Sequence, residues 1–333
     1  MNKTIRRGIY TVFVLGLCFQ TLNANPQRWV TINTINARPI AMGGAFHGVE
    51  DLWAGIHWNP ATLAYIQTES KTQFKIRLNA LAPAILMKNA RSVDKGISPI
   101  ALFMPGIIFQ FNRISIGILT GEESLAQLSR LERTSWLDAS HYETSRNLDI
   151  AIRMRFAPRV SMGIAIESIE QYPEKGRKRW AYRYGILVKP KPYLQVGLCY
   201  YNFDNRISNT RMNLERLPDE TLNIGIAIQP WSKMLLSADI RNVSDDQRDA
   251  TLEPHMGIEI KPIEQLKLRG GFFHRQDIKR DTYSTGIGMQ SKPVDWGTQF
   301  FSTVQWGVDA SYVWENTMHQ KNEWGFLSFY ITF

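Results

Sequence analysis

The sequence has 333 residues, of which 44% are hydrophobic and 11% aromatic, and this aromatic content excludes an intrinsically disordered chain. The mean hydropathy of −0.24 leaves no surplus of apolar residues for a bundle of membrane helices, so a polytopic helical membrane protein is also excluded. The 39 Lys and Arg residues exceed the 30 Asp and Glu residues by 39 − 30 = 9, and the length suits about two ordinary domains or one large closed β-barrel.

The first 24 residues have the composition of a secretory signal peptide. Three basic residues precede an apolar run over residues 9–19, and Ala24 ends the segment with a small residue that suits signal-peptidase cleavage. Cys18 raises the alternative of a lipoprotein, but a leucine precedes it where lipoprotein cleavage requires a small residue. We therefore expect residues 1–24 to be removed on export, and the one remaining cysteine, Cys199, permits no intramolecular disulfide.

Beyond residue 70 the dominant pattern is an alternation of apolar and polar residues with a period of two. In residues 147–156, apolar side chains alternate with asparagine, aspartate and arginine, which indicates a strand because a helix would scatter them around its circumference. The same pattern predicts fourteen strands, at 71–79, 105–112, 114–121, 147–156, 160–168, 180–188, 193–202, 220–228, 234–241, 254–260, 266–274, 283–290, 303–312 and 325–333. We therefore expect an all-β antiparallel protein.

The connections between these strands alternate in length. Short turns are expected at 112–113, 157–159, 189–192, 229–233 and 261–265, and the intervening connections are longer. Only 291–302 breaks this rule, because a short turn is expected there. The alternation is typical of an outer-membrane barrel with tight turns and both termini on the periplasmic side and long loops outside. A soluble β-sandwich or propeller also has short alternating strands and is the alternative.

Two features favour the transmembrane barrel over the soluble alternative. Aromatic residues such as Trp180 and Trp306 cluster near strand ends, as in the girdles at the two membrane interfaces. The last predicted strand places Phe329 and Phe333 on one face and resembles the C-terminal signal that the barrel assembly machinery recognises. We therefore predict a transmembrane antiparallel β-barrel of about 14 strands over residues 71–333, located in the cell outer membrane, with Phe329 and Phe333 serving its assembly.

Residues 25–70 do not alternate and carry a different kind of motif. It consists of Ala37, Arg38, Ala41, Met42, Gly43, Gly44, Ala45, Phe46, Asp51, Trp58, Asn59, Pro60, Ala61, Leu63 and Ala64. Over residues 36–65 this motif resembles the N-terminal motif of the FadL-like and PorV-like outer-membrane protein superfamily. The resemblance implies that residues 25–70 fold inside the barrel as a plug. Arg38 and Asp51 are then the expected polar anchors, because a charge inside a lumen needs an opposite charge or several hydrogen bonds.

The resemblance implies two functions. FadL-like members carry hydrophobic compounds, which leave a plugged barrel through an opening in its wall, and PorV-like members serve the type IX secretion system. We expect the protein to handle hydrophobic small molecules or secreted-protein cargo, and a structural outer-membrane protein without transport activity is the alternative. A wall opening is expected at Pro105 and Gly106, because proline lacks a backbone N–H and glycine leaves space in the ladder. The alternative is that this pair only ends the preceding outer loop.

The sequence contains no pattern that predicts catalysis, a cofactor or a metal. None of the six histidines is spaced to pair with a serine, and His255 with Glu259 supplies only two potential ligands on one strand face. The basic residues 174–179 suit either lipopolysaccharide phosphates or a solvated loop, and the dispersed charge gives no support to nucleic-acid binding. The expected partners are outer-membrane lipid and lipopolysaccharide, the barrel assembly machinery, and a hydrophobic ligand or type IX secretion components.

Overall fold

The computed structural model describes residues 28–32, 37–64, 72–79, 103–125, 144–171, 178–202, 220–241, 243, 252–275, 280–295, 303–316 and 321–333. The strands are β1 (Arg28–Ile32), β2 (Thr72–Asn79), β3 (Gly106–Phe111), β4 (Ile114–Leu125), β5 (Thr144–Ala157), β6 (Val160–Gln171), β7 (Lys178–Lys191), β8 (Leu194–Asn202), β9 (Glu220–Trp231), β10 (Met234–Arg241), β11 (Glu253–Ile263), β12 (Leu266–Arg275), β13 (Arg280–Gln290), β14 (Val294–Asp295), β15 (Thr303–Asn316) and β16 (Lys321–Thr332). The helices are α2 (Ala37–Ala41), α3 (Ala54–Trp58) and the 3-10 helix η1 (Pro60–Thr62).

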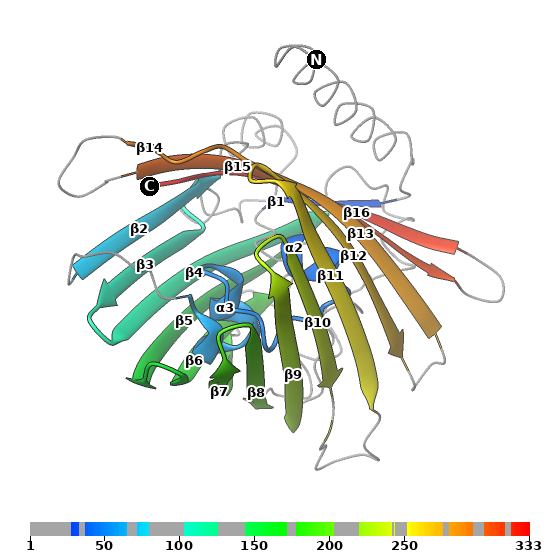
Figure 1. Cartoon of the computed structure of the whole chain (residues 1–333). Coiled ribbons are helices and arrows are strands. Elements are labelled where there is room, and N and C mark those ends of the chain that lie inside the picture. The colour runs from blue at the N-terminus through cyan, green and yellow to red at the C-terminus, as the bar shows by residue number, and fades with distance from the viewer. Residues whose placement is uncertain are drawn as a thin grey trace.

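Within the described residues, fourteen of the strands form one closed antiparallel barrel (Figure 1). Each strand from β2 to β13 pairs with the next, β13 pairs with β15, and β15 pairs with β16. The ring closes where β16 pairs with β2, and there the backbones of Phe333 and Ile76 exchange two hydrogen bonds of 2.9 and 3.2 Å. The prediction of a fourteen-strand antiparallel barrel is confirmed.

The two ends of the barrel differ in the length of their connections. Only two residues separate the strands in the hairpin β3–β4, where Asn112 adopts a left-handed φ of 48° that asparagine tolerates better than most residues. The hairpins β5–β6, β7–β8, β9–β10 and β11–β12 are equally tight, whereas the connections that follow β2, β4, β6, β8 and β10 are longer. We call these ends the short-turn side and the long-loop side.

The strand boundaries differ from the predicted ones mainly on the long-loop side. β4 continues to Leu125, β5 already begins at Thr144, and β15 continues to Asn316. The added residues are largely Glu, Ser, Thr and Asn, so hydrogen bonding continues where the apolar and polar alternation has ended. On the short-turn side the turn predicted at 189–192 is shorter, because β7 runs to Lys191.

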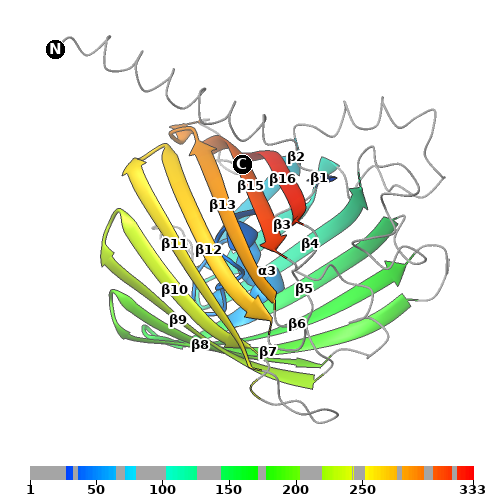
Figure 2. The same cartoon turned by 90° about the vertical axis from the view of Figure 1, so that its right-hand side faces the viewer.

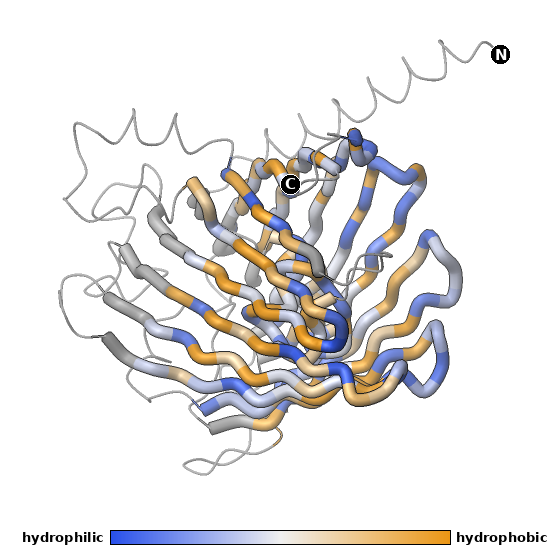
Figure 3. The backbone as a smooth tube through the Cα atoms, turned by 90° about the vertical axis from the view of Figure 1, so that its left-hand side faces the viewer, coloured by the Kyte–Doolittle hydropathy of each residue, from blue (hydrophilic) through white to orange (hydrophobic). Residues whose placement is uncertain are grey.

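The barrel has an apolar outer face and a charged inner face. In β5, Ile150 and Ile152 are 40% and 46% exposed, whereas Asp149 and Arg153 are 3% and 4% exposed. Figure 3 shows this alternation as changes between orange and blue along the strands. Other exposed outer side chains include Leu148, Met154, Met162, Ile164, Ile166, Trp180, Tyr182, Tyr184, Ile186, Ile226, Met256 and Trp306. A soluble sandwich or propeller would bury its apolar face, so this inverted polarity defines an outer-membrane barrel.

Residues 37–64, which we call the inner segment, lie inside the barrel (Figures 1 and 2). α2 packs against β12, β13, β15 and β16, whereas α3 packs against β4 and β5, and η1 against β5, β6 and β7. The inner segment therefore crosses the lumen from one wall to the opposite wall. Among the described residues, no helix is long and apolar enough to span a membrane.

Two described strands were not among the predicted fourteen. β1 pairs in parallel with β16 and antiparallel with β4, and its five residues are too few for a detectable alternation. β14 pairs with the start of β15 inside the predicted connection 291–302. Arg28 is opposite Trp324, near the long-loop end of β16, and β1 runs from there toward the short-turn side.

The inverted polarity predicts that an arginine on the outer face destabilises the barrel according to its depth in the membrane. Ile164→Arg places the charge well inside the apolar band and should lower the free energy of unfolding in lipid vesicles by about 2–4 kcal/mol. Phe156→Arg, beside the β5–β6 turn, is the matched control and should cost roughly 0–1 kcal/mol. Equal losses for the two variants would contradict the assignment of the outer face.

Candidate functional site

The inner segment has a compact backbone that a few residue types make possible. After α2 the chain turns back with hydrogen bonds from Gly43 to Ile40 and from Gly44 to Pro39, of 3.0 and 2.8 Å. Gly43 and Gly44 adopt φ of 63° and 73°, which side chains with a Cβ rarely tolerate. The conformational freedom of this glycine pair is therefore used in a tight turn after α2.

The second half of the inner segment is organised by polar side chains at helix starts. Asp51 Oδ1 accepts hydrogen bonds from the backbone N–H groups of Trp53 and Ala54 at 2.8 and 2.7 Å, at the beginning of α3. Asn59 Oδ1 accepts from Ala61 N at 3.0 Å at the beginning of η1, where Pro60 supplies no N–H. Asp51 and Asn59 thereby satisfy backbone donors that have no partner within such short helices.

Arg38 connects the inner segment to the barrel wall through ion pairs. Its Nη1 donates to Asp51 Oδ2 at 2.5 Å, while its Nε and Nη2 donate to Glu259 Oε2 and Oε1 at 2.8 and 2.9 Å. Glu259, on the inner face of β11, also accepts from Arg269 Nε at 2.8 Å, and Arg269 Nη1 donates to Asp309 at 2.6 Å. A chain of alternating charges thus links α2 to β11, β12 and β15.

The burial of this network shifts the pKa values of Arg38 and Asp51. Burial opposes the charge on Arg38, but Glu259 and Asp51 outweigh it and raise the pKa of Arg38 above its ordinary value. Burial likewise disfavours the Asp51 carboxylate, but Arg38 and the two backbone N–H groups hold the pKa of Asp51 below its ordinary value. Both groups therefore stay charged at neutral pH.

A second set of ion pairs holds the middle of the inner segment. Glu50 accepts a hydrogen bond from Arg153 Nη2 at 2.8 Å and one from Lys189 Nζ, and Arg153 also donates to the carbonyl of Leu63. His47 Nδ1 lies 2.7 Å from Asp239 Oδ2, and burial lowers the pKa of His47. These contacts extend the polar attachment to β5, β7 and β10.

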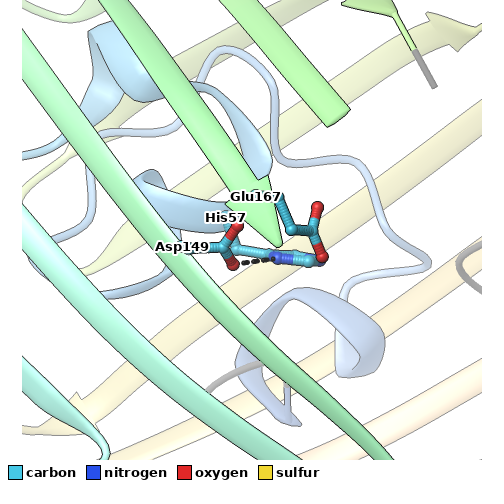
Figure 4. A group of neighbouring side chains, drawn as sticks. All are labelled: His57, Asp149 and Glu167. Carbon is cyan, nitrogen blue, oxygen red and sulfur yellow. Dashed lines mark hydrogen bonds and ion pairs between the residues drawn. The ribbon is translucent and has the colours of Figure 1, made fainter. Parts of the chain in front are cut away.

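A histidine and two acidic residues meet between α3 and the wall, as Figure 4 shows. His57 Nδ1 lies 2.9 Å from Asp149 Oδ2, and ligand atoms of His57, Asp149 and Glu167 all lie within 4.8 Å of one another. Arg183 enters the same cluster, donating to Asp149 Oδ1 and to the His57 carbonyl, with its Nη1 3.5 Å from Glu167 Oε2. Because this guanidinium already pairs with both carboxylates, the cluster joins α3 to β5, β6 and β7 as an ion-pair network, and we assign no metal to it.

The histidine and glutamate considered as metal ligands from the sequence have other partners. Glu259 binds two guanidinium groups, as described above, and His255 Nδ1 lies 2.6 Å from the carbonyl oxygen of Gly43. His274 contacts Asp281 at 2.7 Å. His141 and His319 lie outside the described residues. The sequence could not reveal the cluster at His57, since Asp149 and Glu167 meet through the register of the β5–β6 hairpin and His57 reaches them from the inner segment.

The wall strands approach the inner segment so closely that glycine is required on their inner face. A Cβ on Gly257 would lie 2.5 Å from the Met42 carbonyl oxygen, and one on Gly225 would lie 2.6 Å from Gly48 N. Gly163, Gly185, Gly197, Gly271 and Gly286 make similar approaches from β6, β7, β8, β12 and β13. The inner segment is therefore packed against the wall by backbone contact around much of the lumen, and we call this set of glycines the glycine belt.

Two apolar clusters fill the remaining space between the inner segment and the wall. One contains Met42, Phe46, Val49, Ala54, Trp58 and Ala227, and the other contains Trp53, Ile56, Leu63, Ile108, Leu119, Ala151 and Ala165. Arg241 lies over the Trp58 ring, 4.7 Å from its centroid, and also donates to the Gly44 carbonyl. The motif residues Met42, Trp58, Asn59 and Pro60 thus lie at the contact between segment and wall.

The residues expected at a wall opening lie at the end of a ladder. β3 begins at Gly106, and the Pro105 carbonyl accepts the last hydrogen bond from Thr120 N at 2.9 Å. A Cβ on Gly106 would lie 2.5 Å from the Trp53 ring, so this glycine is required by the inner segment. Pro105 and Gly106 are therefore next to the apolar cluster that contains Trp53, at the first residue of β3.

No protein-family model matches the sequence, and no curated protein sequence matches it. Solved structures match over most of the chain. The monoaromatic hydrocarbon channel CymD has a TM-score of 0.52 at 12% identity, over 88% of this chain and 96% of its own. The toluene transporter TbuX of Ralstonia pickettii has a TM-score of 0.49 at 14% identity over the same shares, and the Pseudomonas putida toluene transporter TodX has 0.48 at 12% identity, over 88% and 95%.

The likeness to CymD shows that the chain shares the fold of this outer-membrane barrel. The matching proteins are named as channels and transporters, not enzymes.

The glycine belt predicts that a single methyl group displaces the inner segment. Gly257→Ala should lower the free energy of unfolding by about 1–3 kcal/mol, because the new Cβ would overlap the Met42 carbonyl. Gly270→Ala is the matched control, since its Cβ would meet only the Ile258 side chain at 3.5 Å. Thermal unfolding of both purified variants measures the difference, and an equal change in both would contradict close backbone packing.

The lowered pKa of Asp51 predicts how acid affects α3. Because the pKa in the folded protein lies below the ordinary value of 3.8, the carboxylate contributes its full stabilisation above about pH 4. That contribution is lost as the pH falls from there through the lowered pKa. Hydrogen-exchange protection of the Trp53 and Ala54 amides should fall over the same pH range. In the Asp51→Asn variant, this pH dependence of the protection should be absent. Loss of protection at pH 6 would contradict the prediction.

Proposed function

We propose that the protein is an outer-membrane channel for hydrophobic small molecules, with the inner segment as its plug. The observation that carries this proposal is the backbone packing of the inner segment against the wall from β6 to β13. A solute that enters from the long-loop side has no straight route past a segment held in this way. It needs an exit through the wall, which suits compounds that dissolve in the membrane.

The surroundings of Pro105 and Gly106 support this place as the lateral exit. Trp53, Leu119 and Ile108 present apolar surface on the inner side of β3 and β4 beside the point where the ladder stops. An exit lined by such side chains would favour aromatic or aliphatic compounds over ions and sugars. CymD, whose fold this barrel shares, is a channel for monoaromatic hydrocarbons, which agrees with that class of substrate.

The proposal extends to export and assembly. Residues 1–24 act as the signal peptide, and Phe329 and Phe333 form the signal for the barrel assembly machinery. In support, the Phe333 backbone exchanges hydrogen bonds with Ile76 where the barrel closes. Outer-membrane lipid and lipopolysaccharide then surround the apolar outer face.

The second candidate function is a PorV-like role with secreted proteins. The motif over residues 36–65 favours it, because a docking partner for cargo needs no open passage and the inner segment is firmly attached. Co-purification of type IX secretion components with the barrel, together with no uptake of hydrophobic probes, would favour this function. If neither co-purification nor uptake is observed, the remaining function is that of a structural outer-membrane protein without transport activity.

Uptake by intact cells tests the channel. Cells that express the barrel should accumulate labelled toluene or oleate faster than cells that carry an empty vector, and the two probes distinguish aromatic from aliphatic substrates. Pro105 faces Thr120 across the ladder, so Pro105→Val adds an N–H that can bond to β4 and extends β3. This variant should slow uptake several-fold at unchanged barrel abundance. Equal uptake by expressing and control cells would exclude the channel function.

A further inference from the structure

β1 is part of the barrel wall at the place where β2 and β3 have ended. It pairs in parallel with β16 from Arg28–Trp324 to Thr31–Leu327, and antiparallel with β4 from Val30–Leu125 to Ile32–Glu123. Figure 2 shows β1 beside β16 and close to the ends of β2 and β3. Since β1 is bonded directly to both neighbours, β2 and β3 do not lie between them at this level.

The wall at this level therefore depends on β1. Elsewhere around the ring, adjacent strands bond to each other, but among the described residues β16 and β4 are joined here only through β1. If β1 leaves, the backbone groups of residues 324–327 and 123–125 lose these partners and a break opens in the wall. This break lies on the long-loop side of Pro105 and Gly106, where β3 begins.

β1 is also held less firmly than the strands beside it. It has five residues, whereas the β15–β16 ladder runs from Gln305–Thr332 to Asn316–Lys321. Its pairing with β16 is parallel, which is slightly less stable for each residue than antiparallel pairing. Short ladders with few bonds are the parts of a fold that open most often.

We propose that β1 is a gate: it closes the barrel wall between β16 and β4, and its unpairing opens the lateral exit beside Pro105 and Gly106 to hydrophobic molecules. The exit function rests on the channel function proposed above. The opening of β1 is a property of the fold and is measured separately. In the closed state, β1 begins on the long-loop side, and only four residues separate it from α2, so the gate and the inner segment are neighbouring parts of one chain.

Hydrogen exchange of the purified barrel in lipid vesicles tests the opening directly. The amides of Val30 and Thr31 should exchange at least about tenfold faster than those of Val308 and Ala310 in the β13–β15–β16 wall, because only β1 opens locally. Equal protection of the two sets would overturn the gate, whether or not the barrel transports anything.

A disulfide that locks β1 tests the exit. Thr31 and Ser124 are directly opposed in the antiparallel pair, a spacing that a disulfide can bridge. When cells that express the double variant Thr31→Cys, Ser124→Cys are treated with an oxidant, toluene uptake should fall to the level of empty-vector cells. Adding a reductant should restore uptake. The buried Cys199 remains in all variants.

The matched control locks two strands that the proposal regards as permanent neighbours. Glu122→Cys with Arg146→Cys joins β4 to β5 in the same part of the wall and should leave uptake unchanged. Normal uptake with the β1 disulfide fully formed would overturn the gate. Absence of uptake by the unmodified barrel would refute the channel function instead, and hydrogen exchange would still decide whether β1 opens.

Discussion

The structure depends on one constraint: a barrel with an apolar outer face must place its charges inside, and there a protein segment restricts the water that would solvate them. Arg38, Glu259 and Arg269 meet this constraint with alternating charges within hydrogen-bond distance. Removing one member would leave its partner charged and buried, which generally costs more than the pair itself contributes. The position of the inner segment is therefore determined by charge as well as by shape.

The glycine belt supplies the shape. Glycine weakens an isolated strand, because it adds conformational entropy to the unfolded chain and has no side chain to pack. In this barrel the inner segment replaces the missing side chains, so that positions such as Gly225 and Gly257 are filled from the lumen. Wall and inner segment thus form one packed unit, and residues such as Trp53 connect it to the end of β3.

The sequence predicted the fourteen-strand barrel well, because inverted polarity gives each strand a strict period of two that needs no knowledge of its neighbours. It also drew attention to Arg38 and Asp51 through the motif. It could not supply their partner Glu259 or the cluster of His57 with Asp149, since these contacts join the inner segment to wall strands that are distant in sequence. β1 escaped prediction for the same reason: its five residues are a strand only because β16 and β4 are both present.

The pairing of β1 with β16 has a consequence for the order of folding. Val30 lies opposite Phe326, so the first described strand cannot complete its ladder until the last strand has been synthesised and exported. Contacts between such distant parts of a chain form late, because the loop that joins them must first be closed at an entropic cost. Hairpins such as β5–β6 can form early from local sequence, whereas the seam at β1 waits for both ends of the chain. A barrel interrupted before β16 would therefore expose the edges of β15 and β2, and β1 would lack its parallel partner.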